Sequence, residues 1–188
     1  MILRPFFFEE TSCASYLFGC TTHGKLAVVE PHEALVDRYF AEAERIGSPI
    51  VAVFETHIQA DHVSGLAELV ARTGANAYLP AGAAVEFEHC DLRNGELAHQ
   101  LHASLQRLLA LPDGVTVYPS HYGGSVCGRG LSANPVSTIG FERRHNQALQ
   151  HDGADSFAAA LLEDVPPPPA GQEAIVAANT RGGSLAPA

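Results

Sequence analysis

The sequence predicts an α/β domain, and three observations support this class. Short runs of β-branched and aromatic residues alternate with segments of helical period through the first half of the chain. The chain has 188 residues, which is enough for one domain to bury a sizeable core. Its 46% hydrophobic and 17% charged residues are typical of a soluble globular protein. We therefore expect one domain over residues 1–165 and a Pro-, Gly- and Ala-rich extended arm over residues 166–188.

Three short strands open the chain. The segments ILRPFFF (2–8), ASYLF (14–18) and KLAVVE (25–30) are separated by polar or glycine-containing turns, which predicts an antiparallel sheet. Residues 32–47 then carry apolar positions at helical spacing and end at Gly47, which predicts a helix with a glycine C-cap.

The next segments complete a strand–helix–strand unit. Residues 48–56, SPIVAVFET, form a continuous apolar run of the kind found in a strand covered on both faces. Residues 63–74 have helical spacing and end at Gly74, and NAYLP (76–80) is a further short strand. This alternation is the basis of the α/β prediction.

The second half is less regular. One stripe of leucines predicts a helix over residues 95–114, which Pro112 and Gly114 stop. VTVYP (115–119) is a predicted strand. A glycine-rich loop follows, and then a short helix within residues 137–149 that Ser137 or Thr138 caps.

Composition also limits the partners and the compartment. The net charge of −10, with no basic stripe, argues against nucleic acid, and no run is long enough to span a membrane. The four cysteines form no CxxC pair, and the N-terminus lacks a signal peptide. We therefore expect a cytoplasmic protein with reduced thiols.

The chemistry concentrates after the strand 48–56. His57 follows the end of that strand, at the edge where α/β sheets place ligands, and Asp61 and His62 open the next helix. Imidazole and carboxylate in this spacing suit zinc, iron or manganese. The alternative is that Asp61 is a helix N-cap and that both histidines are ordinary loop residues. Gln59 lies between them, where a histidine would make a better site.

A fourth candidate ligand lies far along the chain. His121 follows the strand 115–119 as His57 follows its own strand, and two strand ends can meet at one sheet edge. The loop after His121 contains GGSVCGRG, whose backbone N–H groups and Arg129 could bind an anionic substrate, with Tyr122 beside them. Equally, these glycines could serve only to make turns.

These motifs resemble those of a known family. THIQADHVSG (56–65) is similar to the THxHxDH signature of the metallo-β-lactamase superfamily. VYPSHYGGSVCGRGLS, STIGFERRHNQAL and the opening FFFEETSCASYLFG resemble its glyoxalase II-like and persulfide dioxygenase-like branch. The resemblance covers residues 1–180 and implies an αββα sandwich with one or two metal ions at the sheet edge.

The chain departs from that pattern in two places. Gln59 stands where the signature has its second histidine, and an amide is a weak metal ligand. EFEHCDLRNGE (86–96) runs straight into the leucine-rich helix, where the family has TPGHT-type and TGD-type segments. The resemblance therefore implies an internal deletion that removes a histidine ligand and a bridging aspartate and leaves the central or C-terminal sheet incomplete.

The resemblance assigns roles to the residues that remain. Asp61, His62 and His121 match the second metal position, whereas the first retains only His57. One ion is therefore expected rather than two, zinc with iron as the alternative, and His57 and Asp61 are the candidate catalytic residues, with His57 as a fourth ligand or a base. This set favours a metal-dependent hydrolase of a glutathione-type thioester, with weak or lost activity.

Two alternatives remain from the sequence. The chain could be a persulfide dioxygenase-like protein that uses non-haem iron, or a non-catalytic metal- or thiol-binding remnant. Either way the expected ligand is a small thiol-derived molecule. Sheet edges exposed by the deletion make a homodimer plausible.

Overall fold

The computed structural model describes residues 1–80, 83, 85–86, 97–125, 131–163 and 170–182. The chain divides into two compact units. The first contains Met1–Arg93, Ser120–Ala133 and Pro169–Ala188, and the second contains Asn94–Pro119 and Asn134–Pro168. The predicted α/β class is confirmed, and all the candidate metal ligands belong to the first unit.

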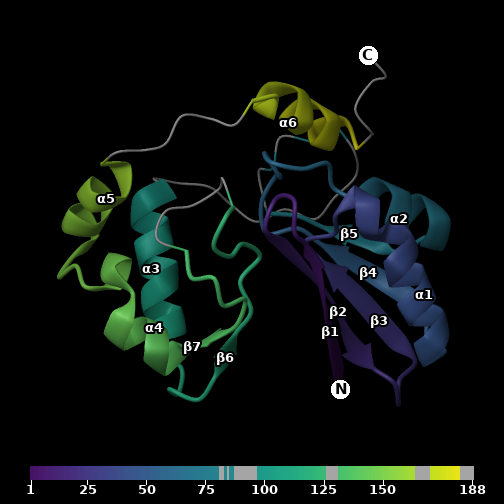
Figure 1. The fold of residues 1–188 in the computed structure, drawn as a ribbon, viewed down its shortest axis with the longest axis horizontal. Coiled ribbons are helices and arrows are strands. Elements are labelled where there is room, and N and C mark those ends of the chain that lie inside the picture. The colour runs from purple at the N-terminus through teal and green to yellow at the C-terminus, as the bar shows by residue number, and fades with distance from the viewer. Residues whose placement is uncertain (81–82, 84, 87–96, 126–130, 164–169, 183–188) are drawn as a thin grey trace. The chain divides into compact units, whose positions relative to one another are not determined.

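A five-stranded sheet forms the centre of the first unit, with its strands in sequence order (Figure 1). The first three strands pair antiparallel through short turns, and the last two continue the sheet in parallel, because a helix connects each of them to the strand before. This arrangement confirms the predicted opening sheet and the strand–helix–strand unit. The strands are β1 (Ile2–Phe8), β2 (Cys13–Cys20), β3 (Lys25–Val29), β4 (Ile50–Phe54) and β5 (Asn76–Tyr78).

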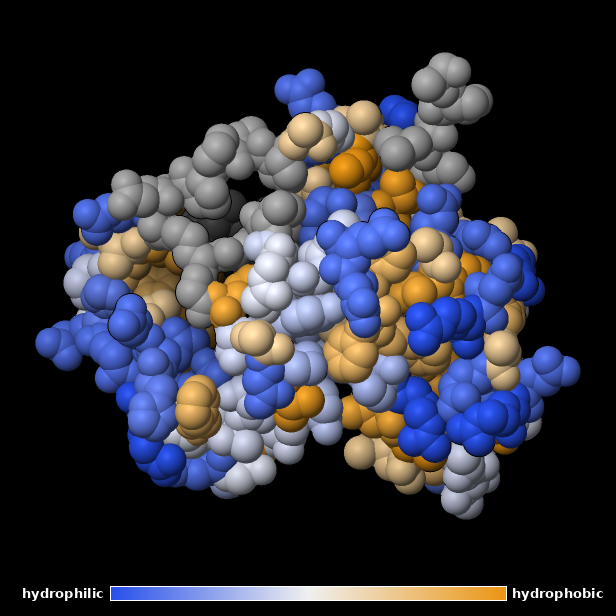
Figure 2. Space-filling model, viewed as in Figure 1, coloured by the Kyte–Doolittle hydropathy of each residue, from blue (hydrophilic) through white to orange (hydrophobic). Residues whose placement is uncertain are grey.

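Two helices cover one face of this sheet and close the core (Figure 1). They are α1 (Val36–Ile46), which a 3₁₀ turn η1 (Glu33–Leu35) precedes, and α2 (Leu66–Thr73). Each ends at a glycine in the left-handed region, as the sequence predicts. The apolar stripes of both helices pack on the buried side chains of β2, β3 and β4. Figure 2 shows hydrophilic side chains over the outer surface of α1.

The C-terminal segment corrects one expectation. Residues expected to lie in an extended arm form the helix α6 (Gln172–Arg181), which belongs to the first unit. Gly171 and Gly182, both in the left-handed region, bound a run that begins with Gln and Glu and contains three Ala. These residues favour a helix, and the proline run before them does not extend into it. Ala178 and Asn179 are buried, so α6 packs on the unit.

The second unit is mainly helical. Its helices are α3 (Leu97–Leu109), α4 (Ile139–His145) and α5 (Ala154–Leu162), with a 3₁₀ turn η2 (Gln147–Leu149) after α4. Thr138 is the N-cap of α4, since its side chain accepts a hydrogen bond from the Phe141 N–H. In the described part of this unit the sheet consists of β6 (Thr116–Val117) paired with β7 (Ser137–Thr138), so the predicted strand 115–119 is only two residues long.

None of the helices in the described residues is long and apolar enough to cross a membrane.

Tyr39 fastens α1 to the sheet. Its side chain is fully buried, and its ring meets Phe6 edge-on at 4.9 Å between centroids. The hydroxyl accepts a hydrogen bond from the His32 N–H at 3.0 Å and shares another with Ser15 Oγ at 2.7 Å. Burial raises the pKa of Tyr39 to about 12, so the hydroxyl stays protonated at neutral pH.

We predict that Tyr39→Phe lowers the free energy of unfolding by about 1–3 kcal/mol, because the ring still packs while the His32 N–H loses its buried partner. Urea denaturation followed by far-UV circular dichroism measures the change. Tyr78→Phe is the matched control, since the Tyr78 side chain is partly exposed, and it should change the free energy by less than about 0.5 kcal/mol. Equal effects from the two variants would contradict the role assigned to the hydroxyl.

Candidate metal centre

The candidate ligands lie in the loop between β4 and α2. The strand ends at Phe54 and the helix begins at Leu66, so Asp61 and His62 do not open the helix as expected. The loop turns back under the carboxyl end of the parallel strands, which is the edge where α/β sheets hold ligands. Asp61 and His62 are consequently buried rather than exposed at a helix start.

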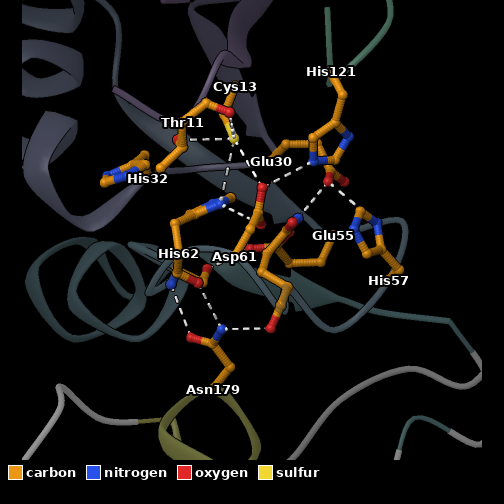
Figure 3. A network of polar contacts seen from close by, with 12 residues as sticks. Thr11, Cys13, Glu30, His32, Glu55, His57, Asp61, His62, His121 and Asn179 are labelled. Carbon is orange, nitrogen blue, oxygen red and sulfur yellow. Dashed lines mark hydrogen bonds and ion pairs between the residues drawn. The ribbon is translucent and has the colours of Figure 1, made fainter. Parts of the chain in front are cut away.

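Asp61 is the centre of the cluster (Figure 3). Its side chain is only 1% exposed, and its two oxygens face different neighbours. Oδ1 lies 3.0 Å from His62 Nδ1, and Oδ2 lies 3.3 Å from His121 Nε2. The structure therefore brings together Asp61, His62 and His121, the three residues expected at one metal position.

Cys13 completes the cluster, although no motif in the sequence singles it out. Its Sγ lies 3.2 Å from Asp61 Oδ2 and 3.7 Å from His62 Nδ1. Cys13 forms an isolated antiparallel bridge with His121, which places the two residues side by side. The Ala14 N–H donates to Ser120 O, and the Tyr122 N–H donates to Ser12 O. No spacing rule connects residues 108 positions apart, so only the fold reveals this pairing.

These residues fit a metal ion. Donor atoms of Cys13, Asp61 and His62 all lie within 4.8 Å of one another. His62 Nε2 and His121 Nε2 are buried and form no hydrogen bond in the described part of the chain. Three groups with available lone pairs, those of Cys13, Asp61 and His62, thus lie together, and His121 approaches them at Asp61 Oδ2. A cation bound beside Asp61 Oδ2 would give the buried His121 Nε2 a partner.

His57 stands apart from the buried cluster. Its side chain is 43% exposed, and its Nδ1 lies 3.5 Å from Glu30 Oε2. The ring centroids of His57 and His121 are 5.8 Å apart. His57 therefore borders the candidate metal centre, where a substrate could reach it.

Gln59 is fully buried and bonds to two carboxylates. Its Nε2 donates to Glu30 Oε2 at 2.5 Å and to Glu55 Oε2 at 2.8 Å. Ser64 Oγ donates to the other Glu55 oxygen, and the Thr56 N–H donates to Glu30. The amide nitrogen that replaces the signature histidine thus forms a structural link, while the Gln59 Oε1 is buried and has no hydrogen-bond partner among the described residues.

The two glutamates are a second feature that the sequence analysis missed. Burial, and next the charge of Glu30, raise the pKa of Glu55 well above its usual range. A proton on Glu55 reduces the repulsion between two carboxyl groups that share one amide. Glu30 also has a left-handed backbone (φ 54°), an uncommon conformation for this residue type that occurs most often at functional sites.

His32 orients the ring of His62. The His32 ring stacks on Phe8 at 3.8 Å and on His62 at 4.6 Å between centroids, nearly parallel to the latter. Its Nδ1 accepts a hydrogen bond from the Ala34 N–H. Burial, and next the neighbouring His62, lower the pKa of His32 to about 4, so this ring is neutral at physiological pH.

Asn179 of α6 fixes the backbone of the ligand loop (Figure 3). Its amide nitrogen donates to Gln59 O and to His62 O, both at 2.9 Å. Its oxygen accepts from the Ser64 N–H at 2.8 Å. A residue more than one hundred positions away therefore satisfies three backbone groups of the loop that carries Asp61.

The two candidate substrate-binding residues have different outcomes. Tyr122 directly follows His121 in the sequence, and its ring lies edge-on to the Phe7 ring at 5.9 Å between centroids. The substrate-binding role of Tyr122 stays a prediction. Arg129 lies outside the described residues. A pocket of about 20 Å³, room for one water molecule, has His57, Gln59 and Asn179 in its lining but none of Cys13, Asp61, His62 or His121. It is therefore separate from the candidate metal centre.

The fold and the cluster define a class: an α/β protein with a candidate metal centre at the carboxyl edge of its sheet. The chain belongs to the metallo-beta-lactamase superfamily, whose family model matches residues 9–167. Members of this superfamily bind metal ions. None of the curated proteins compared with the sequence matches it significantly.

Several solved structures have the same fold. A metallo-beta-lactamase from Staphylococcus aureus subsp. aureus COL is 22% identical with a TM-score of 0.85, covering 99% of this chain and 74% of its own. ETHE1 from Myxococcus xanthus is 24% identical with a TM-score of 0.82, covering 98% of this chain and 100% of its own. TTHA1623 in a di-iron-bound form is 19% identical with a TM-score of 0.54, covering 75% of this chain and 97% of its own. At these identities the similarity shows the fold.

We predict that Asn179→Ala lowers the free energy of unfolding by about 2–4 kcal/mol, because three buried backbone groups of the loop lose their partner. Thermal and urea unfolding measure the loss. Glu173→Ala, an exposed change in the same helix, is the control and should stay within about 0.5 kcal/mol of the parent. If Asn179→Ala also changes the free energy of unfolding by less than about 0.5 kcal/mol, α6 does not hold the loop.

A second prediction concerns the stability of the protein at low pH. The pKa of His32 is about 4 in the folded protein and about 6.5 in an unfolded chain, so below pH 6.5 the unfolded chain binds a proton that the folded protein excludes. The free energy of unfolding of the metal-free protein should therefore fall as pH falls from 6.5 to 4. The slope should be smaller in His32→Phe, which keeps a stacked ring but cannot titrate. Equal slopes for the parent and the variant would refute this contribution.

Proposed function

We propose that the protein is a metal-dependent hydrolase of a glutathione-type thioester, with one ion held by Asp61, His62 and His121. One observation carries the proposal: these three side chains converge in a buried cluster. At the other expected position, the Gln59 amide nitrogen is bonded to Glu30 and Glu55, and no group of three ligating side chains surrounds His57 among the described residues.

The chain's own residues have distinct tasks in this proposal. A zinc ion bound there would supply the Lewis acidity that activates water at neutral pH. Asp61 offers the ion a buried negative charge, and His32 and Asn179 keep the ligand loop in place. His57 is exposed beside the cluster, with Glu30 near its Nδ1, so it can accept a proton and pass it to solvent.

The proposal includes an internal deletion between β5 and α3. In its support, the alignment with the S. aureus protein covers 99% of this chain but only 74% of that one, whereas the alignment with ETHE1 covers all of that protein. A shorter second sheet agrees with the two-residue strands β6 and β7 in the described part of the second unit. The residues on either side of the junction, 87–96, lie outside the described part of the chain.

Persulfide dioxygenase activity with non-haem iron is the second candidate. The fold similarity to ETHE1 supports it at least as well as hydrolysis. Two observations weigh against it: no group of three ligating side chains surrounds His57 among the described residues, and the amide nitrogen of Gln59 is bonded to carboxylates. We therefore place hydrolysis first.

The test compares the two activities in one preparation. Purified protein is loaded with zinc or with ferrous iron, its metal content is measured, and it is assayed for glutathione thioester hydrolysis and for oxygen uptake with glutathione persulfide. We predict one equivalent of metal and zinc-dependent hydrolysis that His62→Ala lowers at least about 100-fold. The exposed His145→Ala is the control and should match the parent.

Other outcomes reject the proposal. Iron-dependent oxygen uptake without hydrolysis would assign the second candidate activity. Metal binding with neither activity would make the protein a non-catalytic remnant. Hydrolysis that is unchanged by His62→Ala would place the activity outside this site. Less than about a tenth of an equivalent of metal would remove the site altogether.

A further inference from the structure

We propose that Cys13 is a metal ligand and that the ion is bound by sulfur as well as by Asp61, His62 and His121. This inference rests on the metal position of the proposed function and specifies its ligand set. It concerns a residue outside the metal-binding motif, on the second strand of the chain.

The Cys13 sulfur has three polar side chains close to it. Asp61 Oδ2 lies at 3.2 Å, His62 Nδ1 at 3.7 Å and Thr11 Oγ1 at 3.1 Å. A buried cysteine that serves only for packing behaves as a small hydrophobic residue and is expected among apolar side chains. The surroundings of Cys13 are instead those of a ligand.

The separations match those between ligands of one zinc ion. Bond lengths of about 2.0–2.3 Å in tetrahedral geometry put neighbouring donor atoms about 3.3–3.6 Å apart. The distances from Asp61 Oδ2 to Cys13 Sγ (3.2 Å) and to His121 Nε2 (3.3 Å) are close to this range, and so is the distance from Cys13 Sγ to His62 Nδ1 (3.7 Å). Cys13, Asp61 and His62 therefore need little rearrangement to hold an ion, and His121, which lies near Asp61, has to move closer to the other two.

The backbone fixes Cys13 in this place. The preceding residue, Ser12, has a left-handed backbone (φ 52°), which is uncommon outside glycine. Hydrogen bonds on both sides of Cys13 tie the start of β2 to residues 120–122, so Cys13 and His121 face the cluster together. Strain of this kind persists where the surrounding structure holds it and is common at functional sites.

Ligation also accounts for Thr11. In the metal-free protein the thiol donates a hydrogen bond to Asp61, and the hydroxyl of Thr11 donates one to the sulfur. On metal binding the thiol proton leaves to solvent, the sulfur becomes a thiolate, and Thr11 remains as its hydrogen-bond donor. A thiolate ligand favours zinc over manganese or magnesium.

A sulfur ligand changes what the site can do. Three protein ligands leave a zinc ion with an open position, whereas four protein ligands form the closed set typical of structural sites. With Cys13 bound, hydrolysis requires a fifth ligand or release of the sulfur. Cys13 ligation thus gives a physical reason for weak activity that does not involve the missing segment.

The test uses cobalt(II) in place of zinc, because thiolate ligation of cobalt produces an intense charge-transfer band in the near ultraviolet. A triple variant that retains Cys13 excludes ligation by the other cysteines; its substitutions are Cys20→Ser, Cys90→Ser and Cys127→Ser. We predict that the parent and this variant both show the band with one equivalent of cobalt. Cys13→Ser should lose the band and keep the weaker visible bands of bound cobalt.

A second measurement tests the proposal even if Cys13→Ser does not fold. Zinc X-ray absorption of the triple-serine variant should show a sulfur neighbour at roughly 2.3 Å. Bound metal with only nitrogen and oxygen neighbours, or a charge-transfer band that survives in Cys13→Ser, would overturn the proposal.

The two proposals fail differently. Sulfur ligation without thioester hydrolysis in any variant would reject the hydrolase and leave Cys13 as a ligand. Zinc-dependent hydrolysis that needs His62, with no sulfur neighbour, would reject the ligand role of Cys13 and leave the hydrolase.

Discussion

The candidate site depends on one constraint: the carboxylate of Asp61 is buried, so its negative charge needs hydrogen-bond donors or a cation beside it. A buried charge is costly unless it is paired or coordinates a metal. Three surrounding side chains, from three separate parts of the chain, supply donors or ligands to it. The pairing of β2 with the segment around His121, the stacking of His32 on His62 and the bonds from Asn179 all keep this balance in place.

A second buried network occupies the position where the family signature has a further histidine. Gln59 supplies the donor that two glutamates share, and the raised pKa of Glu55 relieves the repulsion between them. These hydrogen bonds use the amide nitrogen of Gln59 and oxygens of both glutamates, whereas the Gln59 Oε1 is buried without a hydrogen-bond partner in the described part of the chain. The same sheet edge therefore holds one potential metal centre and, beside it, a hydrogen-bonded link that makes the loop rigid.

Sequence patterns predicted the elements whose signals are local. The strands β1 to β5 and the helices α1 and α2 follow from apolar periodicity and glycine caps, and the loop motif identified Asp61 and His62. The contributions of Cys13 and Asn179 could not be predicted, because each depends on contacts between segments more than forty positions apart. The helix α6 was missed because a proline run dominates the composition of its neighbourhood. Gln59 was identified as unusual, but its glutamate partners become visible only in three dimensions.

Crystals of the zinc-bound protein, measured above and below the zinc absorption edge, test the central claim most directly. One site at a single edge of the sheet predicts one anomalous peak, in contact with Asp61, His62 and His121, while Gln59 keeps its bonds to Glu30 and Glu55. A peak bound by His57 with the Gln59 side chain turned away from the glutamates would contradict the account, and so would two peaks.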